Sequence, residues 1–295
     1  MTTQRAYWLA KPWTAALVCT DMIKAISWNI AHRPVLWNDV VALDADVALL
    51  QEAPEPPQDI AARVNTDAQP WRTEGHTLKR GWRAAVVKLS PRVQATWHEP
   101  KSIKEAMSKE FAVSRLGTLS VATITAPGEE PFIFISMYAA WVRPHTTTKG
   151  SWIYADASAH RLISDLSVFI GRQRGHRIIA AGDLNILHGY GEHRSPYWRA
   201  RYQTIFDRFS ALGLRFVGPQ SPNGRQAKPW PEELPKDSMN VPTYHTNQQG
   251  IAEATRQLDF VFASTGIADQ VRVRALNEVD EWGPSDHCRV AIEVG

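Results

Sequence analysis

The sequence has 295 residues, 44% of them hydrophobic and 21% charged, a balance typical of a globular chain and not of a disordered one. Its 33 Lys and Arg against 30 Asp and Glu give a net charge of +3, too small to indicate nucleic-acid binding by itself. Two cysteines far apart in the chain exclude a disulfide framework and a cysteine metal site, and they fit a reducing cytoplasm.

The first 21 residues contain one short apolar patch, AALVC, which follows Lys11 and Pro12 and ends before Asp21. A signal peptide needs a longer apolar stretch, and no run in the chain approaches the roughly 20 residues that span a bilayer. We expect residues 1–21 to be a loosely ordered, non-secretory extension, with translation starting at Met1 or Met22. A single catalytic domain is expected over 22–295, and no protein partner can be inferred.

Strand-like apolar runs recur along the rest of the chain, and several are apolar enough to be buried on both faces. They lie at 23–28, 47–51, 83–89, 118–125, 132–138, 177–182, 258–263, 271–275 and 288–294. Helical spacing of apolar residues appears at 36–43, 162–170 and 202–212, and Gly213 ends the last. This mixture predicts packed sheets with helices outside. Residues 139–152 and the proline-rich stretch 218–242 read as long loops, which are either functional or tolerated insertions.

The apolar runs end in polar residues suited to metal or phosphate chemistry. Burying so many polar groups at strand ends is costly unless they share a purpose, and charged groups at depth are normally paired or metal-bound. The residues concerned are Asn29, Glu52, Tyr138, Asp183, Asn185, Asp259, Ser285, Asp286 and His287. Each alone has a local interpretation, such as a turn or a helix cap, but the joint pattern favours one site.

These residue types suit the hydrolysis of a phosphate ester. Carboxylates without cysteines favour a hard cation with oxygen ligands, Mg²⁺ or Mn²⁺ rather than zinc. Such a metal offsets the phosphate charge, while a carboxylate or imidazole takes a proton from water. Side-chain amides and a phenol hydrogen-bond the phosphate oxygens as charge builds on them.

The motifs SWNI, LLQE, SMY, GDLN, LDF and SDH, in this order, resemble the signature of the endonuclease/exonuclease/phosphatase superfamily. The resemblance covers Met22 to the C-terminus. It implies an α/β fold of the α+β type, a four-layered sandwich in which two packed mixed β-sheets are flanked by helices. It also implies a metal held by Glu52 and Asp286, with Asn29 close by.

The resemblance further implies the catalytic roles. Asp183 would orient or deprotonate the attacking water, and Asn185 and Tyr138 would contact the scissile phosphate. His287, oriented by Asp259, would bind the phosphate or transfer a proton. Whether the aspartate or the histidine is the base stays open at this stage.

Two positions depart from the pattern of abasic-site nucleases. Ala31 stands where those enzymes place an acid two residues after the asparagine, which weakens a repair-enzyme assignment. Trp141 stands where a polar phosphate contact is expected, and it either packs or stacks on a substrate ring.

Basic and aromatic residues gather in the predicted loops. His188 and His193 flank a Gly-Tyr-Gly-Glu stretch after GDLN, at a second metal site or at the substrate mouth. A basic rim around the mouth is expected to combine these histidines with Arg143, His145, Lys149, Arg194 and Arg199. A further cluster, Arg172, Arg174, His176 and Arg177, reads equally well as a solvated patch.

The sequence therefore favours a metal-dependent nuclease that cuts nucleic-acid phosphodiesters. The alternatives are a phosphatase or phosphodiesterase acting on a small-molecule or lipid phosphate, and a binding protein that kept the fold and lost catalysis. The complete set of catalytic residues argues against the last of these.

Overall fold

The computed structural model describes residues 22–74, 79–108, 110–141, 155–171 and 175–295. The predicted extension at 1–21 and most of the predicted loop at 139–152 lie outside the described residues, as do five of the predicted basic residues: Arg143, His145, Lys149, Arg172 and Arg174.

The first of two large sheets contains both ends of the described chain. Its five strands lie in the order β14 (Val271–Leu276), β15 (Arg289–Val294), β1 (Ile23–Asn29), β2 (Val47–Pro54) and β5 (Trp82–Lys88). The central strands β1 and β2 are parallel, and the other neighbours are antiparallel.

The second sheet has six strands and again a parallel pair inside it. The order is β12 (Leu214–Gly218), β13 (Asp259–Ser264), β11 (Ile178–Asp183), β10 (Phe132–Tyr138), β9 (Leu119–Thr125) and β6 (Gln94–His98). Only β10 and β11 run parallel among these pairs. Two short two-stranded sheets pair β3 (Thr73–Glu74) with β4 (Lys79–Arg80), and β7 (Lys101–Ser102) with β8 (Ala112–Val113).

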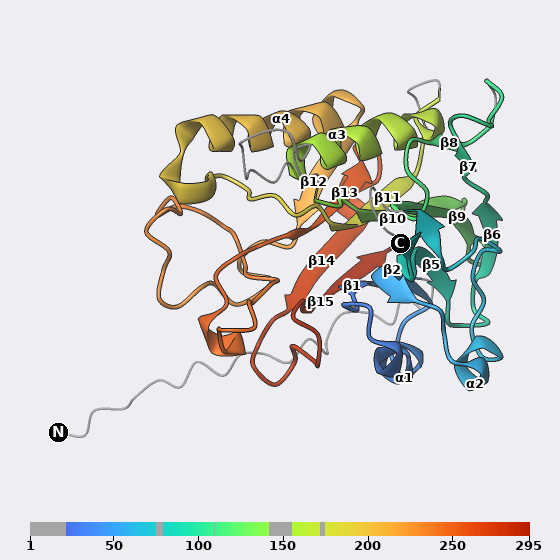
Figure 1. Cartoon of the computed structure of the whole chain (residues 1–295), viewed down its shortest axis with the longest axis horizontal. Coiled ribbons are helices and arrows are strands. Elements are labelled where there is room, and N and C mark those ends of the chain that lie inside the picture. Colours follow the sequence, from blue (N-terminus) through green and yellow to red (C-terminus); the bar gives the residue numbers. More distant parts are fainter. Residues whose placement is uncertain (1–21, 75–78, 109, 142–154, 172–174) are drawn as a thin grey trace.

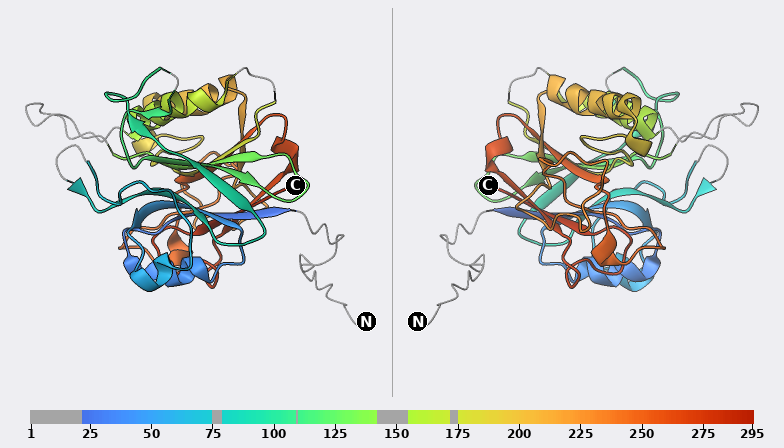
Figure 2. Two further views of the ribbon diagram at one scale, coloured as in Figure 1. Left: turned by 90° about the vertical axis from the view of Figure 1, so that its right-hand side faces the viewer. Right: turned by 90° about the vertical axis from the view of Figure 1, so that its left-hand side faces the viewer.

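Four helices cover the outer faces of the two sheets. The helices α3 (Ala155–Leu166) and α4 (Pro196–Ala211) pack on the second sheet, while α1 (Trp37–Val41) and α2 (Gln58–Ala61) lie below the first. Short 3₁₀ turns occur at Pro34–Leu36, Ser167–Phe169, Glu192–Arg194, Ile251–Glu253 and Ala268–Gln270. The order helix, sheet, sheet, helix is the predicted four-layered sandwich (Figures 1 and 2).

Side-chain alternation along the strands builds these layers. In β1, Ile23 and Ala25 point into the core between the two sheets. Ile26 and Trp28 point to the other face, into the core between the first sheet and α1. Both faces of the strand are covered, and six of its seven residues are buried. The helix α4 starts at Pro196 after Ser195, whose Oγ accepts the N–H of Trp198 at 3.4 Å, and Gly213 with φ +74° follows its end.

Most of the predicted elements are present, with differences at the edges. All nine strand-like runs correspond to strands, but the edge strand β6, the short β12 and the two-residue strands β3, β4, β7 and β8 were not predicted. The predicted loop at 218–242 contains no helix or strand after Gly218. Within the described residues, none of the helices combines the length and hydrophobicity that a membrane crossing requires.

Candidate active site

The polar strand ends meet at one edge of the sandwich because each sheet has a parallel pair at its centre. Tyr138 of β10 is in register with Asp183 of β11, and Asp183 with Asp259 of β13. In the other sheet, Asn29 ends β1 beside Gln51 of β2. Since parallel strands present their carboxyl ends at the same edge, residues far apart in sequence become neighbours.

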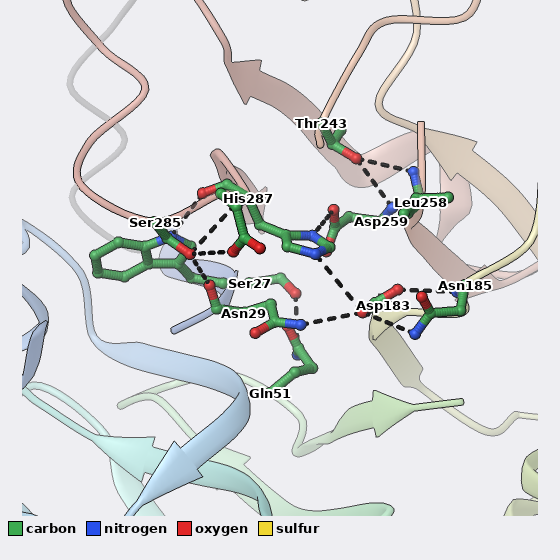
Figure 3. Close-up of polar contacts among 12 residues, drawn as sticks. Ser27, Asn29, Gln51, Asp183, Asn185, Thr243, Leu258, Asp259, Ser285 and His287 are labelled. Carbon is green, nitrogen blue, oxygen red and sulfur yellow. Dashed lines mark hydrogen bonds and ion pairs between the residues drawn. The ribbon is translucent and has the colours of Figure 1, made fainter. Parts of the chain in front are cut away.

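Asp183 lies at the centre of this cluster and is almost fully buried. Its Oδ2 accepts hydrogen bonds from Asn29 Nδ2 at 3.0 Å and from Asn185 Nδ2 at 3.1 Å. Its Oδ1 accepts the backbone N–H of Asn185 at 2.8 Å. Asn185 has φ +51°, a left-handed conformation that asparagine tolerates better than most residues. The two amides therefore fix the carboxylate from opposite sides (Figure 3).

His287 lies between two carboxylates. Its Nδ1 is 2.8 Å from Asp259 Oδ2, and its Nε2 is 3.8 Å from Asp183 Oδ2. The backbone of the histidine is also held, because Trp28 Nε1 donates to its carbonyl oxygen at 3.0 Å. Tyr244 packs against the imidazole at 4.9 Å between ring centroids. The orientation of the ring is thus set on several sides.

Burial and mutual charge shift the pKa values of both groups. Burial raises the pKa of Asp183 to about 7; the carboxylates of Asp259 and Glu52 add to this, while His287 opposes it. Burial lowers the pKa of His287, but Asp259 and Asp183 outweigh it and raise that pKa to about 10. Both carboxylates therefore favour the charged form of the ring, in which Nδ1 donates to Asp259.

Glu52 lies within β2, where the pairing with β5 shifts between Leu50 and Ala53, and it has a strained conformation with φ +48°. Its Oε2 contacts Nε2 of His32, whose ring stacks on Trp82 at 5.2 Å between centroids. Burial raises the pKa of Tyr138, and the nearby charge of Glu52 and a hydrogen bond to its carboxylate add to the rise. Glu52 is thus held between a histidine and a phenol.

Asp286 is joined to Asn29 by hydrogen bonds of the Ser285 hydroxyl. The hydroxyl Oγ of Ser285 lies 2.7 Å from Asn29 O and 3.2 Å from Asp286 Oδ1. Burial raises the pKa of Tyr244, and the charges of Asp286, Asp183 and Glu52 add to the rise, so all three carboxylates act on one side chain.

The donor set fits a hard cation that keeps part of its water shell. No group of three or more His, Cys, Asp or Glu side chains among the described residues is arranged to hold a metal by itself. The available donors are carboxylate and amide oxygens of Glu52, Asp286 and Asn29. Mg²⁺ is commonly bound by one or two carboxylates with water completing the shell, so this chemistry suits Mg²⁺ or Mn²⁺.

Three residues predicted to touch the substrate lie around this cluster in different settings. Trp141 is 50% exposed and lines a cavity of about 990 Å³ that Asn185 and Tyr244 also line. His188 is half-buried: the centroid of its ring lies 4.4 Å from that of Phe206, and its Nδ1 is 3.1 Å from Asn240 Oδ1. The exposed Arg194 forms an ion pair with Glu232.

Two residues that support the site had no role in the sequence-based prediction. The fully buried Thr243 accepts the backbone N–H groups of Leu258 and Asp259 at 3.0 and 3.1 Å (Figure 3). Gln51 Nε2 donates to Ser136 Oγ at 3.0 Å and so joins the two sheets beneath the site. No local pattern marks either residue, because their partners lie far away in sequence.

The sequence of residues 26–287 matches the family model described as endonuclease/exonuclease/phosphatase family. The chain belongs to this family. Its members are hydrolases that act on phosphate esters, so the resemblance seen in the motifs is confirmed. No curated protein matches the sequence at a significant level.

Solved structures of the same fold include enzymes that act on DNA. The endonuclease domain of TRAS1, a telomere-specific non-LTR retrotransposon, superposes with a TM-score of 0.55 at 15% identity, over 92% of this chain and 98% of that one. The AP endonuclease LMAP from Leishmania major gives 0.58 at 15%, over 93% and 88%. The 3′ phosphatase NExo from Neisseria, bound to a product DNA hairpin, gives 0.52 at 18%, over 92% and 99%. At 15–18% identity, these superpositions show a shared fold and no more.

Proposed function

We propose that this protein is a divalent-metal-dependent nuclease that hydrolyses phosphodiester bonds of nucleic acid. The observation that carries the proposal is the placement of Asp183, fixed by Asn29 and Asn185 and facing the imidazolium of His287. The solved enzymes of the same fold that act on DNA, and the Trp141-lined cavity beside Asn185, support nucleic acid as the substrate.

We propose Asp183 as the group that orients and deprotonates the attacking water. A base must be able to accept a proton, and a histidine charged at neutral pH cannot. Oδ2 of Asp259 lies 2.8 Å from Nδ1 of His287 and favours the charged ring. The Nε2–H of His287 can then donate to a phosphate oxygen. Raised toward 7, the pKa of Asp183 lies near the value that suits a base at neutral pH.

Asn185 and Tyr138 are proposed to bind the non-bridging oxygens of the scissile phosphate. Asn185 Nδ2 also donates to Ala139 O at 3.2 Å, which holds the amide beside the end of β10. Fixed donors of this kind stabilise charge that builds in the transition state without having to reorganise.

Glu52 and Asp286, with Asn29 close by, are proposed to hold Mg²⁺ or Mn²⁺. When bound, such an ion neutralises phosphate charge and stabilises the leaving oxygen. Asp286 is connected to Asn29 through Ser285, so the two predicted ligands share one support. The two distant cysteines fit a protein that acts in the reducing cytoplasm.

A phosphatase or phosphodiesterase acting on a small-molecule or lipid phosphate is the second candidate. Two features favour it: Ala31 replaces the acid of abasic-site nucleases, and the cavity beside Asn185 has the volume of a small-ligand pocket.

Purified protein incubated with Mg²⁺ and plasmid DNA, RNA or a panel of phosphomonoesters separates the two functions. The nuclease proposal expects nicking or cutting of nucleic acid that is abolished by a chelator and by Asp183→Ala. Release of inorganic phosphate without cutting would instead establish the second candidate. Turnover that Asp183→Ala leaves at the wild-type rate would reject the proposed site.

A further inference from the structure

A second cavity, of about 560 Å³, lies beside the β5 edge of the first sheet. It is enclosed by the segment before β3, the start of β5, the β7–β8 region and helix α3. Five basic side chains and one carboxylate line it: Arg72, Arg83, Lys104, Arg115, Arg161 and Glu105. Arg83 is already paired with the buried Asp67 at 2.8 Å, so the other four cations define the character of the cavity.

Arg115 is the most informative of these residues. Its side chain is buried, with 9% of the residue exposed, yet its Nη1 has no hydrogen-bond partner among the described residues. Buried guanidinium groups are normally satisfied by acceptors, because desolvation without a partner is costly. Burial, with the charges of Arg80 and Arg161 adding to it, lowers the pKa of Arg115 to about 10, so the group stays charged at neutral pH. Asp165 interacts with Arg161, but Nη1 of Arg115 has no acceptor within the part of the chain that the structure describes, and an anion in the cavity would supply one.

The cavity adjoins the candidate active site through the backbone that carries Arg115. The carbonyl of Arg115 accepts the hydroxyl of Thr118 at 2.8 Å, and the carbonyl of Thr118 accepts the N–H of Tyr138 at 2.9 Å. Arg80 interacts electrostatically both with Arg115 and with Glu52 of the proposed metal site. Arg80 therefore places a positive charge near both Glu52 and Arg115.

We propose that this cavity is a second phosphate subsite, which binds a phosphate group of the substrate other than the one hydrolysed. Arg115 and Arg161 would be its main donors, with Lys104 and Arg72 at its rim. Guanidinium groups bind phosphate with paired, charge-assisted hydrogen bonds, which suits the unpartnered Nη1. The inference rests on the proposed function, since it concerns a second phosphate of the same substrate.

Binding of inorganic phosphate to the metal-free protein tests the subsite without any turnover. The melting temperature of wild-type protein should rise with phosphate when ionic strength is matched with chloride. Arg115→Gln and Arg161→Gln should each weaken the apparent phosphate affinity by roughly tenfold or more. Arg272→Gln is the matched control, because it removes one exposed positive charge from β14, at the opposite edge of the first sheet; it should bind phosphate as the wild type does.

The inference is overturned if wild-type protein shows no phosphate-specific shift, or if both arginine variants bind phosphate as tightly as the control. Arg161 lies on the partly exposed face of α3, so Arg161→Gln decides the matter if Arg115→Gln does not fold. A protein that binds phosphate here but cuts no nucleic acid keeps the subsite and loses the nuclease proposal, so the two failures are distinguishable.

Labelled oligonucleotides in EDTA identify the source of the phosphate. Strands with a 5′-phosphate, a 3′-phosphate or two hydroxyl ends are compared on wild type and Arg161→Gln. A preference for one phosphorylated end that the variant loses assigns the subsite to a terminal phosphate. Equal weakening for all strands assigns it to an internal phosphodiester, and equal binding by variant and wild type contradicts the subsite.

Discussion

Thr243→Val tests how the backbone beneath the His287–Asp259 pair is held. The Thr243 hydroxyl accepts two backbone N–H groups, those of Leu258 and Asp259, in a position without solvent exposure. Valine has nearly the same shape but offers no acceptor, so both donors would be buried without a partner.

The structure gives the size of the effect. Each buried orphaned donor costs about 1–3 kcal/mol, so for two donors we expect the free energy of unfolding to fall by about 2–6 kcal/mol. For a chain of this length that corresponds to a loss of roughly 3–10 °C in melting temperature. The backbone N–H of Asp259 would lose its acceptor, so the carboxylate of Asp259 would be held less firmly against His287. We therefore expect kcat for cleavage to fall on the order of 10- to 100-fold, with KM little changed.

Urea denaturation and steady-state kinetics on the same preparations measure both effects. Thr243→Ser is the control, since it keeps the hydroxyl and should retain most of the stability and activity. If Thr243→Val were as stable and as active as the serine variant, the hydroxyl would not support Asp259, and the reasoning would be refuted.

Asp183→Asn should lower kcat on the order of 1000-fold, because it removes the proposed base. The pKa of Asp183 is raised from its ordinary value of 3.8 to about 7 in the folded protein. The free energy of unfolding therefore falls as pH rises from about 3.8 to about 7, where the carboxylate becomes charged. In EDTA this variant should therefore gain melting temperature over wild type between pH 5 and pH 8; no gain would contradict the raised pKa. The pKa of His287 is raised to about 10, so its stabilisation is complete below about 6.5 and is lost as pH rises through 10. Asp259→Asn should lower that pKa in an NMR titration of the ring, and an unchanged value would argue against the pairing. Arg83→Met leaves Asp67 buried without its ion-pair partner. The free energy of unfolding, measured by urea denaturation, should fall by about 3–5 kcal/mol. A loss smaller than that of a surface arginine variant would show that the pair contributes little.

The strands and most of the active-site cluster could be predicted from the sequence because both follow local rules. The buried strand β11 is a continuous apolar run that ends at its first polar residue, Asp183, and β1 is mostly apolar and ends at Asn29. The edge strand β6 was missed because none of its five residues is fully buried and its sequence, QATWH, has only a weak apolar pattern.

Other features depend on contacts that no local pattern encodes. Thr243 follows a proline-rich loop and acts on residues 15 and 16 positions further along the chain. The ring of His188 packs against Phe206 and Phe216, contacts that no local pattern indicates, and its predicted place near the substrate stays a prediction. His32 was not predicted as a site residue, although its Nε2 contacts Glu52 and its ring stacks on Trp82.

A double-mutant cycle between the two sheets tests most directly whether their strand ends form one hydrolytic centre. Glu52→Gln, Asp183→Asn and the double variant are compared for kcat on the preferred substrate at saturating Mg²⁺. Residues that act as one unit are strongly non-additive, so we expect the double variant to be about as slow as the slower single variant. A double variant whose loss equals the product of the two single losses, or a single variant with the wild-type rate, would contradict a shared centre.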